Sequence, residues 1–581
     1  MSSPSISMPS GSWLFRSSLL MPAILIAICT LLVVAPLLRI LTSTLTPEGL
    51  AAWQAVLFSP LSMNLWWRPL LNTMLLGFGV AAGCLLLGGF LAWLVVLTDV
   101  PGRRLLGLVG TLPYMIPSFA AALAWGTLFR NSRLGGSVGF FEANGIAIPD
   151  WLAWGIVPAM IVLIAHYYSL AYTIIAAALS SVGADMVEAG QMAGARRSRI
   201  FFGIILPVVA PALVAASSLT FAGAVANFAA PALLGLPVRM QTLSTRLFGL
   251  IETGQQERGF VLALLLIVVS ATLLWLSDRI VSGRKAFVTV TGKGGRTKRF
   301  PLGPWRWPLF AIAASIGFMT TVAPILVLGA SSFAPQSGAL FSNWTLSFWI
   351  GEGGGEIAQG QAGIFRNPVL LEALWNTIRL GIVVAITTML LGLALAYTIV
   401  QRRGSLLAKV LSQLAFTPLL VPSIAFAAAY IALYGAPIGP LPSLYGTFLL
   451  LVLAASAHNL PFAVQSGRSV LGQISADIEE SARLTGAGPL RRLAVITFPL
   501  AIRGLGAGAI LVFVKMVRDL SLVVLLFTST SPVLSMVAYR YAAEGFMQFA
   551  NAITLIILVV CLAASVLAEL LQSRVQKWKQ S

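Results

Sequence analysis

The sequence contains few charged residues: only 9% of its 581 residues are Asp, Glu, Lys or Arg, whereas 58% are hydrophobic. A soluble globular domain carries about 25% charged residues, so this chain is not built to face water on all sides. Its mean hydropathy is +0.92, and apolar stretches of roughly 20 residues, the length that crosses a bilayer core, recur along it. The composition therefore predicts an all-α membrane protein, because helices satisfy their own backbone hydrogen bonds in lipid.

Side chains that react or bind metals are also scarce. The three cysteines, Cys29, Cys84 and Cys561, lie in apolar stretches without paired spacing, so we expect neither a disulfide framework nor a thiol metal site. No paired carboxylates, Ser/His pair or cluster of metal ligands is present outside the apolar stretches. We therefore expect no catalytic residues, no metal site and no cofactor bound by this chain, which argues against a membrane enzyme.

Positive charge is concentrated in alternate connections between the apolar stretches. The chain has 37 Lys and Arg against 18 Asp and Glu, a formal net charge of +19. Such a bias places the basic connections, and with them both chain termini, in the cytoplasm, and it explains the charge without nucleic acid. The first apolar stretch, about residues 19–40, is too long for the core of a signal peptide, so we expect it to be retained as a helix.

The apolar stretches predict about twelve transmembrane helices in two tandem halves of six. The expected spans are 17–41, 69–98, 105–129, 151–180, 203–233 and 259–282, followed by 307–331, 373–400, 405–434, 443–467, 496–527 and 549–572. We expect residues 1–282 and 307–581 to form two units joined by a basic cytoplasmic linker, 283–306. The linker contains "TGKGG", but Phe287 and Gly294 break the G-x-x-x-x-G-K-[ST] pattern of a nucleotide-binding loop.

The two halves are similar in sequence. "LNTMLLG" at Leu71 resembles "WNTIRLG" at Trp375, and "LPYMIPSFAAALAW" at Leu112 resembles "TPLLVPSIAFAAAY" at Thr417. Six spans return the chain to the side from which it started, so both halves have the same orientation. The sequence therefore indicates a duplicated pore-forming unit.

One polar segment occurs in each half with the same design. The segments are "EAGQMAGARRSRIFFGIILP" at Glu188 and "ESARLTGAGPLRRLAVITFP" at Glu480, and matched residues lie 292 positions apart. We expect a short helix, a turn at a glycine that needs backbone freedom, and a proline where the next helix starts. A loop that only fixes topology needs no more than positive charge, so this design favours docking on a soluble partner.

The spacing Glu-Ala-x-x-x-x-Gly, nine residues, Ile-x-Leu-Pro resembles the Glu-Ala-Ala loop of ABC importer permeases. In that family the loop forms a coupling helix that fits a cleft on the ATPase subunit. The resemblance implies coupling loops at about 184–207 and 476–499, with the residues Glu188, Ala189, Gly194, Ile204 and Pro207 in the first loop and Glu480, Ala482, Gly486, Ile496 and Pro499 in the second. The sequence departs from the pattern at Gly190, Ser481 and Phe498.

Across about residues 70–570 the chain most resembles the fused, two-unit permeases of ferric-iron importers. The resemblance is carried by "TDVPGRRLLG", "NFAAPALLGLPVRMQTLSTRLF" and "RDLSLVVLLFTSTSPVLSMVAYRYAAEG". It implies the type I ABC importer permease fold in a bacterial inner membrane. The implied partners are two copies of a cytoplasmic ABC ATPase, through which ATP acts, and a periplasmic solute-binding protein that delivers ferric iron. Thiamine, polyamine and phosphonate stay open as solutes, because those systems share the architecture or the loops.

Two histidines are candidates for the transport path, because polar groups at membrane depth usually face a cavity or another helix. His166 and His458 are the only histidines and lie 292 positions apart. We favour a hydrogen bond to a neighbouring helix for each of them, with contact to substrate as the alternative.

Asn227 and Asp519 form a second pair with the same offset. Along a straight helix they would lie about 30 Å beyond the loop prolines, near the outer side. Lys515 and Arg518 are close to Asp519 and have no charged counterpart in the first half. We favour an internal ion pair there, with contact to substrate or an outer gate as the alternative.

A secondary transporter of the major facilitator type is the remote alternative. "DVPGRR" at Asp99 resembles the D-x-x-G-R-R loop of that group, but the corresponding stretch of the second half reads "QRRGSLLAK". A secondary transporter has two similar halves but no use for two matching coupling loops.

Overall fold

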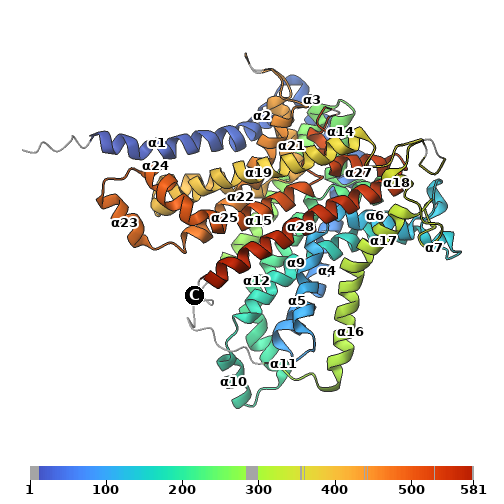
Figure 1. Ribbon diagram of the computed structural model, residues 1–581, viewed down its shortest axis with the longest axis horizontal. Coiled ribbons are helices and arrows are strands. Elements are labelled where there is room, and N and C mark those ends of the chain that lie inside the picture. Colours follow the sequence, from blue (N-terminus) through green and yellow to red (C-terminus); the bar gives the residue numbers. More distant parts are fainter. Residues whose placement is uncertain are drawn as a thin grey trace, which may run out of the picture.

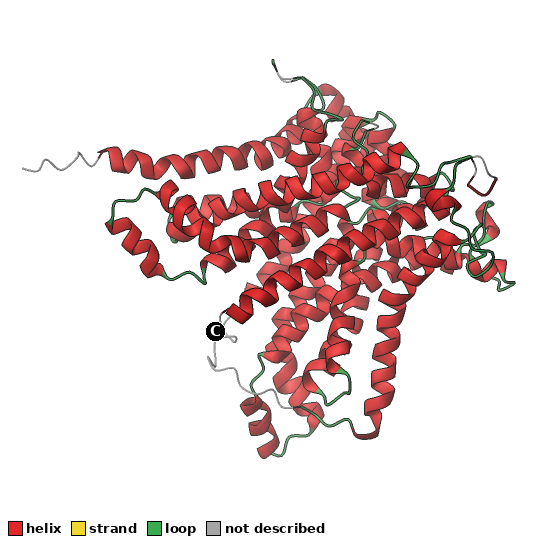
Figure 2. Ribbon diagram, in the orientation of Figure 1, coloured by secondary structure: helices red, strands yellow, loops and turns green. Residues whose placement is uncertain are grey.

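The chain is described here by a computed structural model that covers residues 12–282, 299–353, 356–358, 360–437, 439–440, 442–528 and 530–578. Helices make up most of this part, and its only β contact is an isolated bridge between Thr98 and Phe300 (Figure 2). Among the described residues nine helices are long and apolar enough to cross a membrane, and up to twelve if each of three bent pairs is one span. The expected all-α membrane fold is confirmed.

The described part of the first half contains fifteen α-helices, among which α4, α9, α12 and α15 are long. They are α1 (Ser12–Cys29), α2 (Ala35–Ser43), α3 (Pro47–Leu57), α4 (Arg68–Leu97), α5 (Arg103–Thr111), α6 (Ser118–Phe129), α7 (Phe140–Ala143), α8 (Asp150–Ala153), α9 (Ile156–Ser180), α10 (Ala184–Met192), α11 (Arg197–Ile200), α12 (Leu206–Ala226), α13 (Ala229–Leu234), α14 (Leu243–Glu252) and α15 (Gln256–Ser282).

Among the described residues, the second half repeats this order but has no counterpart of α7 and α8. Its helices are α16 (Arg306–Gly317), α17 (Ala323–Phe333), α18 (Ser347–Ile350), α19 (Pro368–Gln401), α20 (Leu406–Phe416), α21 (Ser423–Tyr434), α22 (Phe448–Leu471), α23 (Ala476–Leu484), α24 (Pro489–Arg492), α25 (Phe498–Val517), α26 (Val523–Leu526), α27 (Leu534–Ala543) and α28 (Met547–Trp578). Of the linker expected at 283–306, residues 283–298 lie outside the described residues. Beyond them, the Leu302 N–H donates to Asp99 Oδ1 over 2.8 Å, so Asp99 of "DVPGRR" accepts a hydrogen bond from the backbone just before α16.

The third span of each half is bent sharply. The expected span 105–129 changes direction by 95° between α5 and α6, and the expected span 405–434 by 110° between α20 and α21. Both bends lie at a proline, Pro117 or Pro422, that follows a β-branched residue in extended conformation. A residue before proline avoids the helical region, so each helix ends there.

Prolines also shape the spans that follow the polar loops. Pro207 and Pro499 are each the second residue of a helix, α12 and α25, as expected. However, each helix continues directly from a π-helical turn, Phe201–Ile205 or Leu493–Thr497. A proline blocks the normal hydrogen bond to the preceding turn and crowds its carbonyl group, which a π turn relieves.

The first span of each half packs against the other half. α2 lies against α21, and the Tyr430 hydroxyl donates to the Leu32 carbonyl oxygen over 2.7 Å. Reciprocally, α16 and α17 pack against α5 and α6, and the hydroxyl groups of Tyr168 and Thr320 share a hydrogen bond of 3.1 Å. The two halves are thus joined by exchanged helices as well as by their common interface.

A glycine permits a close helix crossing in each half. α4 packs along α9, and α19 along α22. A Cβ atom on Gly88 would lie 2.7 Å from the carbonyl oxygen of Tyr168, and one on Gly392 would lie 2.4 Å from the Cβ of Ala463. Small residues let membrane helices approach closely in this way.

The two polar loops lie far from the point where the halves meet. Figure 1 shows α10 and α23 at the free ends of two groups of helices that spread apart, with α7 and α18 at the opposite end. We call the end that carries α10 and α23 the loop end.

Candidate functional site

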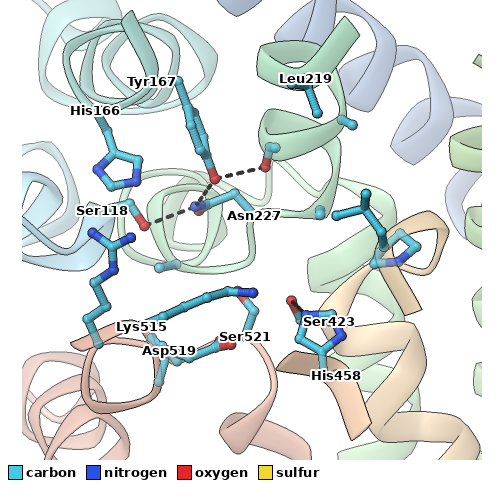
Figure 3. Close-up of a pocket in the computed structure, with 18 of the residues that line it drawn as sticks. Ser118, His166, Tyr167, Leu219, Asn227, Ser423, His458, Lys515, Asp519 and Ser521 are labelled. Carbon is cyan, nitrogen blue, oxygen red and sulfur yellow. Dashed lines mark hydrogen bonds between the residues drawn. The ribbon is translucent and has the colours of Figure 1, made fainter. Parts of the chain in front are cut away.

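A cavity of about 370 Å³ lies between the two halves, and it brings together all four residues proposed for the transport path. Each half contributes a serine from its proline bend, a histidine from its fourth span and a polar residue from the end of its fifth span. These are Ser118, His166 and Asn227 from the first half and Ser423, His458 and Asp519 from the second (Figure 3). The pseudo-symmetry of the sequence is therefore visible in the cavity itself.

Both histidines are buried, and at least one is bonded to a neighbouring helix. His458 Nε2 lies 3.1 Å from the Ser423 hydroxyl on α21. His166 stacks on Tyr114, with ring centroids 5.3 Å apart. Within the described part of the chain, Nδ1 of each histidine has no hydrogen-bond partner. The hydrogen bond expected to an adjacent helix is thus present for His458, while both rings also line the cavity.

Asn227 ties three elements together beside the cavity. Its Nδ2 donates to the Ser118 hydroxyl over 2.9 Å and to the Tyr167 hydroxyl over 3.4 Å, while its Oδ1 accepts from the Ala230 N–H and so caps α13 (Figure 3). The expected outer location of Asn227 needs correction. The span predicted at 203–233 ends at Ala226, and Asn227 lies level with Tyr167, which is close to the middle of α9.

The ion pair expected around Asp519 is not formed. Among the described residues, no carboxylate lies within 4.0 Å of the Lys515 or Arg518 charge, and Asp519 Oδ1 accepts instead from the Leu522 N–H over 3.1 Å. Lys515 Nζ lies 3.9 Å from the centroid of the Phe462 ring. Arg518 lies over Tyr114, 4.4 Å from its ring centroid, and donates to that residue's carbonyl oxygen. Both cations therefore rest on aromatic rings at the cavity wall.

The two loops have the conformation that the sequence predicts. α10 and α23 occupy matched positions, and a glycine with positive φ lies two residues beyond the end of each, Gly194 at 75° and Gly486 at 79°. The Ala195 N–H donates to the Gly190 carbonyl oxygen over 3.0 Å, and the Ala487 N–H to that of Ala482 over 3.2 Å. These bonds close the helix ends in the way that a left-handed glycine permits.

The remaining residues of the predicted loops divide into exposed and packed positions. Glu188, Ala189 and Glu480 are exposed, whereas Ala482 is buried and Ile204 and Ile496 are half-buried. The departure at Gly190 has a packing reason, because a Cβ atom there would lie 3.0 Å from Ile204 Cδ1.

Two residues at the loop tips did not emerge from the sequence analysis. Met192 and Leu484 end α10 and α23, and they are 89% and 90% exposed. They lie at matched positions, each four residues after its glutamate. Their common offset is the signal that would have found them. An exposed apolar side chain at the tip of each loop fits a site that inserts into a partner.

The second loop has a buried polar anchor that the first loop lacks. Arg492 Nη1 lies 3.1 Å from Glu479 Oε1, and the side chains are only 10% and 15% exposed. The Tyr397 hydroxyl donates to the same oxygen over 2.5 Å. The matched positions of the first half hold Val187 and Ile200, both buried. One loop is thus held by an ion pair and the other by apolar contact.

Comparison with known proteins agrees with this architecture. The family described as "binding-protein-dependent transport system inner membrane component" matches twice, over residues 84–285 and 388–577. The chain belongs to this family. One match in each half identifies a fused two-unit permease of an ABC importer, a multi-pass component of the inner membrane.

Several relatives of this permease are named as ferric transport proteins. The ferric transport system permease protein FbpB of Actinobacillus pleuropneumoniae is 24% identical over 463 residues, which cover 78% of this chain and 63% of the relative. The chain thus spans slightly less than two thirds of that protein. The Fe(3+)-transport system permease protein FbpB 2 of Haemophilus influenzae is 24% identical over 514 residues, covering 87% and 89%.

Other relatives carry the names of different solutes. The sulfate transport system permease protein CysT of Salmonella typhimurium is 27% identical over 191 residues, covering 32% of this chain and 66% of the relative. A solved bacterial ABC transporter involved in the import of alginate is 16% identical, covers 46% of this chain and 96% of its own, and has a TM-score of 0.36.

Proposed function

We propose that this permease moves a solute delivered by a periplasmic binding protein into the cytoplasm, and that two copies of a cytoplasmic ATPase drive it through α10 and α23. One observation carries the proposal: each half presents the same exposed helix, with matched glutamates and apolar tips, at the loop end. The permease holds the path, and ATP acts through the partner subunit.

The loops have a direct mechanical connection to the cavity. The first loop leads through α11 and a π turn into α12, which ends beside Asn227. The second leads through α24 and a π turn into α25, which ends beside Arg518 and Asp519. In the proposed cycle, ATP closes the ATPase pair and draws the loops together, the halves rock, and the cavity opens to the binding protein. Hydrolysis then restores the other state.

Ferric iron is the cargo that the named relatives favour, since FbpB proteins cover most of this chain. Phosphonate is the second candidate, because a 2-aminoethylphosphonate permease of Salmonella typhi is 30% identical over 151 residues. Thiamine and polyamine stay possible on the architecture alone.

The test is uptake by the complete importer, reconstituted in proteoliposomes with its ATPase and binding protein. Uptake by wild type is expected to require ATP and both partners. Glu188→Ala and Glu480→Ala are each expected to lower it about tenfold or more without lowering the amount of inserted permease, because both side chains are exposed and contribute little to folding. Accumulation of solute by the permease alone would contradict the proposal.

A further inference from the structure

The cavity between the halves carries a net positive charge. Its walls hold Lys515, Arg518 and Asp519 as charged side chains, together with the rings of His166 and His458. Both cations come from the second half, and the matched positions of the first half are Gly223 and Ala226. The two positive charges are thus present in the second half only and are not repeated in the duplicated unit.

These cations lack a carboxylate within ion-pair distance in the described part of the chain. Asp519 is the nearest acid in sequence, and one of its oxygens is occupied by the Leu522 N–H. Burying an unpaired cation at membrane depth is costly, so such residues usually meet a partner or line a path for a charged solute. The aromatic contacts of Lys515 and Arg518 orient them but do not neutralise them.

The cavity offers hydrogen-bond donors but no metal cage. Hydroxyl groups of Ser118, Ser423 and Ser521 line it with the two cations, and the described residues contain no group of three or more His, Cys, Asp or Glu side chains that would hold a metal ion. A bare trivalent cation would be repelled by two positive charges and attracted by only one carboxylate.

We infer that the cargo crosses this cavity as an anion: a solute that presents carboxylate, phosphate, phosphonate or sulfate oxygens, either free or as the ligand shell of a metal ion. Lys515 and Arg518 are the residues that recognise its charge. This inference rests on the proposed function, because it assumes that a solute crosses the cavity. The sign of the electrostatic potential in the cavity, however, is testable on the permease alone.

The direct test compares how fast two thiol reagents of opposite charge modify a cysteine in the cavity. Leu219 lines the cavity and is 39% exposed (Figure 3), so the purified Leu219→Cys permease is treated with anionic sulfonatoethyl or cationic trimethylammonioethyl methanethiosulfonate. The native Cys29, Cys84 and Cys561 are buried, and wild type gives the background. The ratio of the two rates cancels any change in reactivity of the thiol itself.

The matched control is Leu134→Cys, an exposed position in the connection after α6. Relative to this control, the anionic reagent is expected to be favoured on the order of tenfold at Leu219→Cys. Lys515→Gln or Arg518→Gln should lower that preference several-fold, Lys515→Arg should keep it, and Asp519→Asn should raise it. A preference for the cationic reagent, or a ratio that both Gln variants leave unchanged, would overturn the inference.

A second measurement separates the two sources of the anion. The complete importer in proteoliposomes is given radioactive iron together with labelled citrate or phosphate. Iron entering with its anion indicates a metal complex, and anion entering without iron indicates a free oxyanion; iron entering without any anion would overturn the inference. If wild type takes up neither iron nor either anion in an ATP-dependent manner, the proposal of ferric iron as cargo fails, while the rate ratio still reports the charge of the cavity.

Discussion

Gly486→Val is expected to abolish ATP-dependent uptake while the permease stays folded in the membrane. Gly486 has a φ of 79° and no atom within 4 Å of an added Cβ, so the backbone conformation, and not a steric clash, disfavours the substitution. Holding a β-branched residue at positive φ costs about 1–3 kcal/mol of folding free energy. We expect the backbone to relax to a negative φ instead, which changes the direction of the turn from α23 to α24. ATP hydrolysis by the reconstituted importer should no longer drive uptake, and the rate of uptake should fall at least about tenfold.

Gly488→Val is the matched control for this change. Gly488 lies two residues further on, also with nothing within 4 Å of an added Cβ, but its φ is −66°, a value open to any residue. We therefore expect the Gly488→Val importer to take up solute at a near-normal rate. Equal uptake by both variants would show that the geometry of the second loop is unimportant for coupling.

Arg492→Met is expected to destabilise the second loop strongly. It leaves the Glu479 carboxylate and the Tyr397 hydroxyl in a buried place without their cation. Removing one partner of a buried ion pair costs about 3–5 kcal/mol, whereas replacing both by apolar residues of fitting shape is often neutral. The loss should appear as faster proteolysis of the loop between α22 and α25 and as a large loss of uptake.

The first half supplies the rescue for this experiment. Its matched positions hold Val187 and Ile200, so the double variant Glu479→Val/Arg492→Ile copies an arrangement that already works in the same fold. It should recover most of the loop stability lost in Arg492→Met. A double variant as unstable as the single one would mean that the ion pair contributes more than the burial of its parts.

Local sequence carried much of the architecture. Apolar stretches predicted the spans, which are nine single helices and three bent pairs among the described residues. The glycines of the polar repeat predicted left-handed turns, because glycine is the residue that most readily adopts a positive φ. The bends at Pro117 and Pro422 were harder to predict from the sequence. A proline signals a helix end, but the angle between the two helices depends on what packs on each side. The spans expected to continue to 233 and 527 likewise end early, at Ala226 and Val517, because tertiary packing decides where these helices end.

Contacts between distant segments could not be obtained from the sequence. The exchange of first helices between halves depends on packing between segments hundreds of residues apart, as in the Tyr430 contact with Leu32. Lys515 and Arg518 were noticed beside Asp519 in sequence, and proximity suggested an ion pair. In the folded chain aromatic rings of other helices, Phe462 and Tyr114, take up the cations instead.

The labelling of the two loop tips from either side of the membrane shows whether α10 and α23 face the cytoplasm. Met192→Cys and Leu484→Cys, made one at a time, are treated in intact spheroplasts with a maleimide that cannot cross the membrane. Phe341→Cys, in the connection from α17 to α18 opposite the loop end, serves as control. In intact spheroplasts we expect labelling of Phe341→Cys only. After permeabilisation we expect labelling of both tips, unless the ATPase is bound. Labelling of either tip in intact spheroplasts would contradict the proposed coupling, since a cytoplasmic ATPase could then not reach that helix.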